Sequence, residues 1–95
     1  MGQEDARLVQ ATRGGDREAF AQLVRRYRDA VYGAAYHRVG DFSVAEDLTQ
    51  DALIQAYVRL GELRDPGRFA SWLFAVTRNL CNQHLWEHRP AQPAR

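Results

Sequence analysis

The residues of this chain best suited to chemistry lie near its C-terminal end, where arginine, asparagine and tryptophan recur at steps of three or four residues. That spacing places their side chains on one face of a helix. Amides can hydrogen-bond base edges, arginine can bind phosphate, and tryptophan can stack on an unpaired base, which is worth roughly 1 to 3 kcal/mol per base. The alternative is that both tryptophans close the edge of a small core and the asparagines are only solvated. The face comprises Arg68, Trp72, Ala75, Asn79, Asn82 and Trp86, with Arg78 and Arg89 at its edge.

A second candidate face lies earlier in the chain and combines hydrogen-bond acceptors with branched apolar residues. Ile54 and Val58 fall among these acceptors, on the side of a helix opposite its apolar stripe. A solvated surface is the simplest interpretation of an acidic helix face. The two apolar residues instead favour a docking surface for a basic, partly apolar partner helix. The acceptors are Glu46, Asp47, Gln50, Asp51 and Gln55.

Two kinds of chemistry find little support in the sequence. Cys81, His84 and His88 share one arc of a helix and could supply three metal ligands, but no fourth ligand is evident, so we expect neither a metal site nor a cofactor. The chain also has no phosphate-binding glycine loop, no HExxH motif and no GxSxG motif, and its acidic residues fall on solvent-facing helical positions. We therefore expect that the protein is not an enzyme.

These side chains must be positioned by helices, because no segment alternates apolar and polar residues over the length of a strand. Asp16 is the predicted N-cap of the helix at 16–38. Ser43 is the predicted N-cap of the helix at 43–60, where it would form a capping box with Glu46. Gly61 marks the end of that helix, and Asp65 is expected to cap the last helix, with Pro66 in its first turn. The fold class is all-α, a compact bundle of one short N-terminal helix and three main helices, at about 4–12, 16–38, 43–60 and 68–88.

Apolar residues at helical spacing predict which sides of the last two helices face the core. The stripe of the helix at 43–60 is Ala45, Leu48, Ala52, Ala56 and Leu60. The stripe of the helix at 68–88 is Phe69, Leu73, Val76 and Leu80.

Composition agrees with one small globular domain of 95 residues, 45% of them hydrophobic and 26% charged. All thirteen basic residues are arginine, and the formal net charge is +1. That charge is unevenly distributed, because residues 1–58 carry a net charge of −2 and residues 59–95 a net charge of +3. The single cysteine cannot form an internal disulfide, and no apolar run approaches the length of a membrane span, so we expect a cytoplasmic location and no membrane insertion.

Two stretches of the sequence resemble region 2 of bacterial sigma factors, and the extracytoplasmic-function (ECF) group in particular. They run from Ala45 to Tyr57 (AEDLTQDALIQAY) and from Leu63 to Asn79 (LRDPGRFASWLFAVTRN). Residues 16–27 (DREAFAQLVRRY) resemble the opening segment of that group. The resemblance implies a sigma region 2-like domain at 1–89, and a flexible tail at 90–95 that begins a linker to a region 4 domain absent from this chain.

The resemblance also implies two partners. In sigma factors, the segment similar to residues 47–51 docks on the clamp helices of the RNA polymerase β′ subunit, which would assign polar contacts to Asp47, Gln50 and Asp51 and apolar ones to Leu48 and Ile54. The loop similar to residues 63–68 and the helix after it capture a flipped base of the non-template strand in the promoter minus-ten element, so that melting proceeds without nucleotide hydrolysis. The family's Trp-Leu pattern favours Trp72 as a packing residue that supports this loop, and base stacking by Trp72 is the alternative. The implied DNA-binding residues are Arg64, Asp65, Arg68, Phe69, Trp72, Arg78, Asn79, Asn82 and Gln83. The alternative is a helical interaction module that an anti-sigma factor or another regulatory protein binds, without direct DNA reading.

Overall fold

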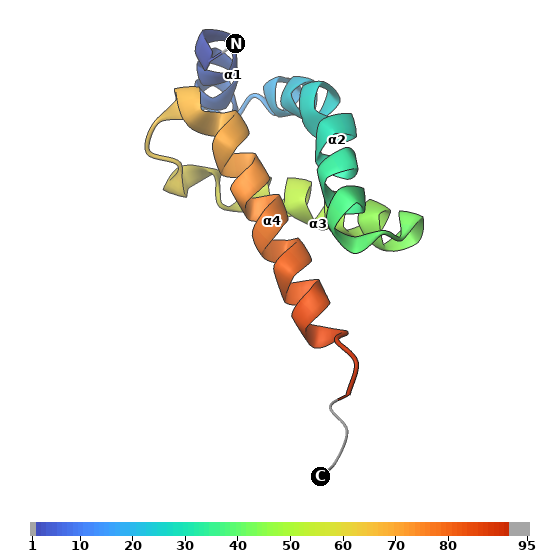
Figure 1. Cartoon of the computed structure of the whole chain (residues 1–95). Coiled ribbons are helices and arrows are strands. Elements are labelled where there is room, and N and C mark those ends of the chain that lie inside the picture. Colours follow the sequence, from blue (N-terminus) through green and yellow to red (C-terminus); the bar gives the residue numbers. More distant parts are fainter. Residues whose placement is uncertain (1, 92–95) are drawn as a thin grey trace.

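The computed structural model describes residues 2–91 and contains four α-helices (Figure 1). Two short 3-10 turns, η1 (Leu60–Glu62) and η2 (Pro66–Arg68), connect the last two helices. The described residues contain no strand, so the all-α prediction is confirmed. Residues 92–95, which form most of the predicted tail, lie outside the described residues. The helices are α1 (Gly2–Arg13), α2 (Arg17–Val39), α3 (Phe42–Val58) and α4 (Phe69–Glu87).

The ends of α2 follow the local signals in the sequence. The carboxylate of Asp16 accepts a hydrogen bond from the backbone N–H of Ala19 at 3.1 Å, which confirms the predicted N-cap. At the other end Gly40 adopts the left-handed conformation, with φ of 69°, and its N–H donates to the carbonyl of Tyr36 at 2.8 Å. A glycine suits this position because a side chain would strain the left-handed backbone.

The predicted ends of α3 are wrong at both termini. Asp41, not Ser43, is the N-cap, and its carboxylate accepts from the N–H of Val44 at 3.0 Å. Ser43 lies inside the first turn, because the left-handed Gly40 redirects the chain one residue before the extended Asp41. A carboxylate at this end also interacts favourably with the helix dipole. Helix α3 stops at Val58, and Gly61 lies in η1 without a positive φ.

The core forms where all four helices meet, and the predicted stripes face it. The α3 stripe is buried throughout, and of the α4 stripe only Leu80 is partly exposed. Helix α1 adds Leu8 and Val9 to the larger cluster of buried residues. A smaller cluster lies where the second half of α2, the first half of α3 and the later turns of α4 meet, and consists of Ala35, Ala45, Leu48 and Cys81. Burial of these apolar side chains supplies most of the stabilisation of the bundle.

A buried carboxylate fastens α1 to α2. Asp5 is 1% exposed, accepts a hydrogen bond from the hydroxyl of Tyr27, and pairs with the guanidinium of Arg26 at 2.9 Å. Both carboxylate oxygens therefore have partners, as a buried charge requires. The sequence did not reveal this pair of contacts.

Helix α1 also holds the connection between α3 and α4. The guanidinium of Arg13 donates to the carbonyl of Leu60 at 2.9 Å and to the carbonyl of Leu63. Asp65 caps η2 by accepting from the N–H of Gly67 at 3.0 Å, whereas the N-cap of α4 itself is Arg68, which makes no side-chain cap hydrogen bond, so the predicted cap belongs to the preceding turn. These bonds fix the loop that leads into α4.

Candidate functional site

The second candidate face of the sequence forms an exposed strip along α3, which we call the α3 strip: Asp47, Gln50, Asp51, Ile54 and Val58. Ile54 is 54% exposed and Val58 is 74% exposed, although both are apolar. The three polar residues are exposed as well. The strip therefore offers acceptors and apolar area to the same partner.

The α3 strip borders an apolar groove that the sequence did not reveal. The groove lies between α2 and α3, has a volume of about 320 Å³, and includes Ile54. Phe20 of α2 packs edge-on against Tyr57 of α3 inside it, with ring centroids 5.0 Å apart. Phe20 and Val24 are half-buried on the side of α2 that faces this groove. The other lining residues are Val24, Gln50 and Leu53.

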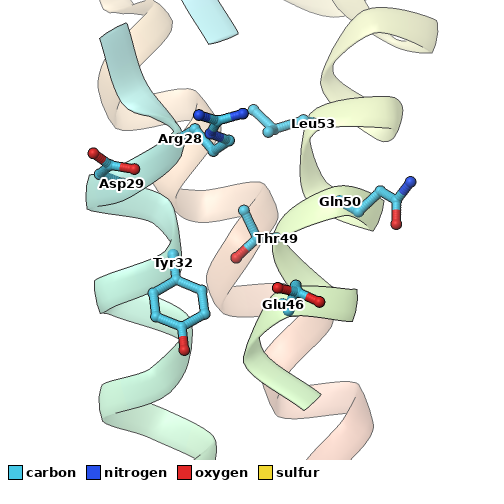
Figure 2. A pocket seen from close by; sticks show the side chains of 7 residues that line it. All are labelled: Arg28, Asp29, Tyr32, Glu46, Thr49, Gln50 and Leu53. Carbon is cyan, nitrogen blue, oxygen red and sulfur yellow. The ribbon is translucent and has the colours of Figure 1, made fainter. Parts of the chain in front are cut away.

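A second groove of about 480 Å³ continues between the same two helices and is mixed in polarity (Figure 2). Arg28 and Leu53 extend into the space between the helices, whereas Asp29 points away from α3 and Gln50 away from α2. The hydroxyl of Thr49 donates to the carbonyl of Ala45 at 2.7 Å, which satisfies the polar group at the floor of the groove.

Leu48, one of the residues expected to contact the polymerase, does not belong to the α3 strip. It is 8% exposed and packs with Ala35, Ala45 and Cys81 in the smaller core cluster. Only a small part of its side chain reaches the surface, where it lines a pocket of about 200 Å³ between α3 and α4. The expected polymerase contact is therefore corrected to a role that is mainly packing.

The first candidate face of the sequence lies on α4 and the turn before it, and we call it the α4 face. Arg64, Asp65 and Arg68 are exposed, and the carboxylate of Asp65 lies 3.8 Å from the guanidinium of Arg68. Along the helix Arg78, Asn79, Asn82 and Gln83 are exposed in turn. Seven of the nine expected DNA-binding residues are therefore exposed, and the remaining two are Phe69 and Trp72.

The aromatic residues of α4 divide into two groups. Phe69 is 1% exposed and packs against Tyr27 and Trp72, so a direct contact with DNA is excluded and its role is corrected to packing. Trp72 is half-buried against the larger cluster and closes its edge. Trp86 is 65% exposed, with the guanidinium carbon of Arg89 at 3.6 Å from the ring centroid. The core-closing alternative therefore holds for Trp72 and fails for Trp86.

One contact joins α2 to the α4 face. The guanidinium of Arg38 donates to the amide oxygen of Asn82 at 2.8 Å, across a sequence separation of 44 residues. Arg38 had no part in the sequence-based prediction, and no local pattern could have linked it to Asn82.

The metal-site alternative finds no geometric basis. Cys81 is completely buried among apolar residues, and this burial raises the pKa of its thiol. His84 is half-buried and its ring stacks on that of the exposed His88, with centroids 4.1 Å apart. Over residues 2–91, no three His, Cys, Asp or Glu side chains are grouped as metal ligands. Over the same residues, no helix has the length and hydrophobicity needed to span a bilayer.

Comparison of the sequence with those of known proteins identifies its family. The family model for sigma-70 region 2 matches residues 23–90. The chain is 39% identical over 83 residues to the ECF RNA polymerase sigma factor BldN of Streptomyces coelicolor, covering 86% of this chain and 31% of that protein. It is 32% identical over 82 residues to the ECF RNA polymerase sigma factor SigW of Bacillus subtilis, covering 86% of this chain and 44% of that protein. It is 35% identical over 83 residues to the RNA polymerase sigma-H factor of Pseudomonas aeruginosa, covering 87% of this chain and 43% of that protein. The chain thus spans less than half the length of each of these relatives.

The matched residues include α3, the loop after it and all of α4, which carry both candidate faces. The chain therefore belongs to the sigma-70 region 2 family, as a region 2 domain of the ECF type.

Proposed function

We propose that this domain acts in transcription initiation by docking on RNA polymerase through α3 and by recognising and helping to melt the promoter minus-ten element through α4. The observation that carries the proposal is the presence, in one sigma region 2 domain, of two separate exposed surfaces with different chemistry. The α3 strip is acidic and apolar, whereas the α4 face carries arginines and amides.

The chemistry of the α3 strip supports docking on the β′ clamp helices. Asp47 and Asp51 are one turn apart and can accept charge-assisted hydrogen bonds from arginine or backbone donors. Ile54, one turn further, removes exposed apolar area from water when a partner helix covers it. Its exposure in the free domain costs stability that binding would recover.

The α4 face and its loop support capture of an unpaired base. A flipped base loses stacking, and the protein must replace it with hydrogen bonds to the base edge and contacts to the backbone. Asn79 can supply such bonds, and the arginines beside it can bind phosphates. Because Arg13 and Asp65 already hold the loop, binding costs little ordering entropy there.

Charge reversal separates the two proposed surfaces. We expect Asp47→Arg with Asp51→Arg to weaken binding of a β′ clamp-helix fragment by at least about tenfold, because like charges then face each other. Asp29→Arg is the matched control, since the side chain of Asp29 points away from α3 (Figure 2). Clamp binding that survives the double reversal would overturn the docking proposal.

Removal of one amide tests the DNA surface. We expect Asn79→Ala to leave clamp binding unchanged and to weaken capture of single-stranded oligonucleotides carrying minus-ten sequences by about five- to tenfold, the value of about one hydrogen bond. The readout is fluorescence anisotropy over a panel of sequences. Equal binding of every sequence by both proteins would argue against base reading by Asn79.

A second candidate function rests on the apolar groove between α2 and α3. A regulatory protein such as an anti-sigma factor could insert an apolar helix where Phe20 and Tyr57 are accessible. Co-expression with candidate partners, with Tyr57→Arg as the blocking variant, tests this function. Equal partner capture by the variant and the unmodified chain would reject the groove as its site.

A further inference from the structure

A third groove, of about 340 Å³, lies between α2 and α4. Helix α2 contributes Ala34 and Arg38, and α4 contributes Ser71, Phe74, Ala75, Thr77 and Arg78. No acidic residue lines it, and beside the alanines and the serine a ligand can approach the helices closely. The groove is therefore bounded by two cations, with small residues and the ring of Phe74 between them.

The two arginines of this groove retain uncompensated charge. Within residues 2–91, neither has a carboxylate within 4.0 Å, whereas Arg7, Arg25, Arg26, Arg59 and Arg68 each do. The partner of Arg38 is the amide oxygen of Asn82, which orients the guanidinium without neutralising it. Several N–H donors of Arg38 remain for a ligand, and an anion is the ligand that they and Arg78 would bind.

The position of the groove identifies the kind of anion. Beyond the groove, Asn82 lies one turn after Arg78 on the same side of α4, and Arg89 follows seven residues later, just past the end of the helix. This line runs beside the proposed base-contacting residues of the same helix. A chain of linked phosphates fits such a line better than a small isolated anion does.

We propose that the groove between α2 and α4 binds the phosphodiester backbone of a DNA strand, and that Arg38 is a phosphate contact contributed by α2. The inference deepens the proposed function and rests on it. Arg38 and Arg78 hold the backbone by charge, independently of sequence, while Asn79 is left to contact a base. The bond from Arg38 also keeps the amide oxygen of Asn82 turned inward, so that its N–H groups can donate to the strand.

The test measures binding of fluorescein-labelled single-stranded dT12 and of a mixed-sequence 12-mer across a range of salt concentrations. We expect Arg38→Ala to weaken binding of both oligonucleotides by the same factor and to make the slope of log Kobs against log salt shallower by about 0.7. The ratio of the affinity of the unmodified chain to that of Arg38→Ala should therefore fall by a factor of about 2.6 over a fourfold rise in salt concentration. Arg28→Ala is the matched control, since Arg28 is also exposed on α2 but faces α3 (Figure 2).

A second variant neutralises the groove without removing Arg38. Ala34→Glu places a carboxylate one turn before Arg38 on α2, where the pair should also stabilise the helix. We expect this variant to keep its helicity by circular dichroism and to lose affinity as Arg38→Ala does. If both variants bind as tightly as Arg28→Ala, the groove does not bind DNA.

The outcomes for the groove and for base reading are distinguishable. Loss of binding in Arg38→Ala with no effect of Asn79→Ala would keep the groove and overturn base reading. The reverse result would overturn the groove and keep the proposed function. Phosphate contacts are strong at low salt, so a further measurement is made at about 50 mM salt. If the unmodified chain binds neither oligonucleotide there, both the groove and the proposed DNA recognition are overturned.

Discussion

Asp5 and Tyr27 show how much of this domain's stability depends on single polar contacts. The hydroxyl of Tyr27 donates to a carboxylate that is almost completely buried. When a buried acceptor loses its donor, the folded state is destabilised, because the acceptor has given up its hydrogen bonds to water without a replacement. This contact therefore fixes α1 on the bundle, and through Arg13 it also affects the loop before α4.

Removal of the Tyr27 hydroxyl should destabilise the fold measurably. We expect Tyr27→Phe to lower the free energy of unfolding by about 1 to 3 kcal/mol, because the buried carboxyl group of Asp5 loses a hydrogen-bond partner. The measurement is urea unfolding followed by circular dichroism. Tyr32→Phe is the control, as Tyr32 is a half-buried residue of the same helix, and its effect should stay within about 0.5 kcal/mol. Equal losses in the two variants would show that the hydroxyl of Tyr27 has no special role.

The same residue predicts a pH dependence at alkaline pH. Burial, together with the hydrogen bond to Asp5, raises the pKa of Tyr27 from 10.0 to about 12. The folded chain then holds this proton more tightly than the unfolded chain, so the stabilisation is complete below pH 10 and is lost as the pH rises towards 12. The free energy of unfolding should fall by about 2 to 3 kcal/mol more over this window in the unmodified chain than in Tyr27→Phe. Parallel pH profiles would contradict the assignment.

Burial also explains why residue-level assignments from sequence were only partly right. Leu48 and Phe69 stand inside stretches that resemble functional segments, and both also belong to apolar stripes. The packing of α3 and α4 on their neighbours decides between these roles, and both side chains are buried. Ile54 is apolar but exposed, as the position on its helix indicated, whereas the exposure of Trp86 decides between two alternatives that the sequence left open.

At the scale of elements, the four helices were predictable because their signals are local. Apolar spacing, Asp16 and Gly40 lie within or next to the helices that they define. The start of α3 was mispredicted because Asp41 and Ser43 are both good capping residues. The left-handed turn at Gly40 selects Asp41, and this choice depends on how α2 ends.

The identity of the α3 cap can be tested with two substitutions. We expect Asp41→Ala to lower the free energy of unfolding by about 1 kcal/mol, because the N–H of Val44 loses its acceptor. Ser43→Ala should change it by less than about 0.5 kcal/mol, since Ser43 is exposed inside the first turn. Thermal and urea unfolding of both variants provide the comparison. A larger loss in Ser43→Ala would restore the capping box as the true start of α3.

At the scale of the whole molecule, the contacts between distant segments were not predictable from the sequence. Arg38 meets Asn82 only because α2 and α4 pack against each other, and Arg13 reaches the η1 turn only because α1 covers it. The molecule is also elongated, 56 × 23 × 20 Å, and Figure 1 shows α4 extending past the other helices. The near-neutral net charge thus conceals an acidic strip on α3 and a cationic line along α4.

The central claim is that α3 and α4 present separate binding surfaces for a polymerase and for DNA. The most direct measurement is nuclear magnetic resonance titration of the ¹⁵N-labelled chain, first with a β′ clamp-helix fragment and then with single-stranded minus-ten oligonucleotides. We predict that the clamp fragment shifts the amide signals of Asp47, Asp51 and Ile54, and that the oligonucleotides shift those of Arg38, Asn79 and Asn82. Shifts of the same residues in both titrations, or DNA-induced shifts centred on α3, would contradict the account.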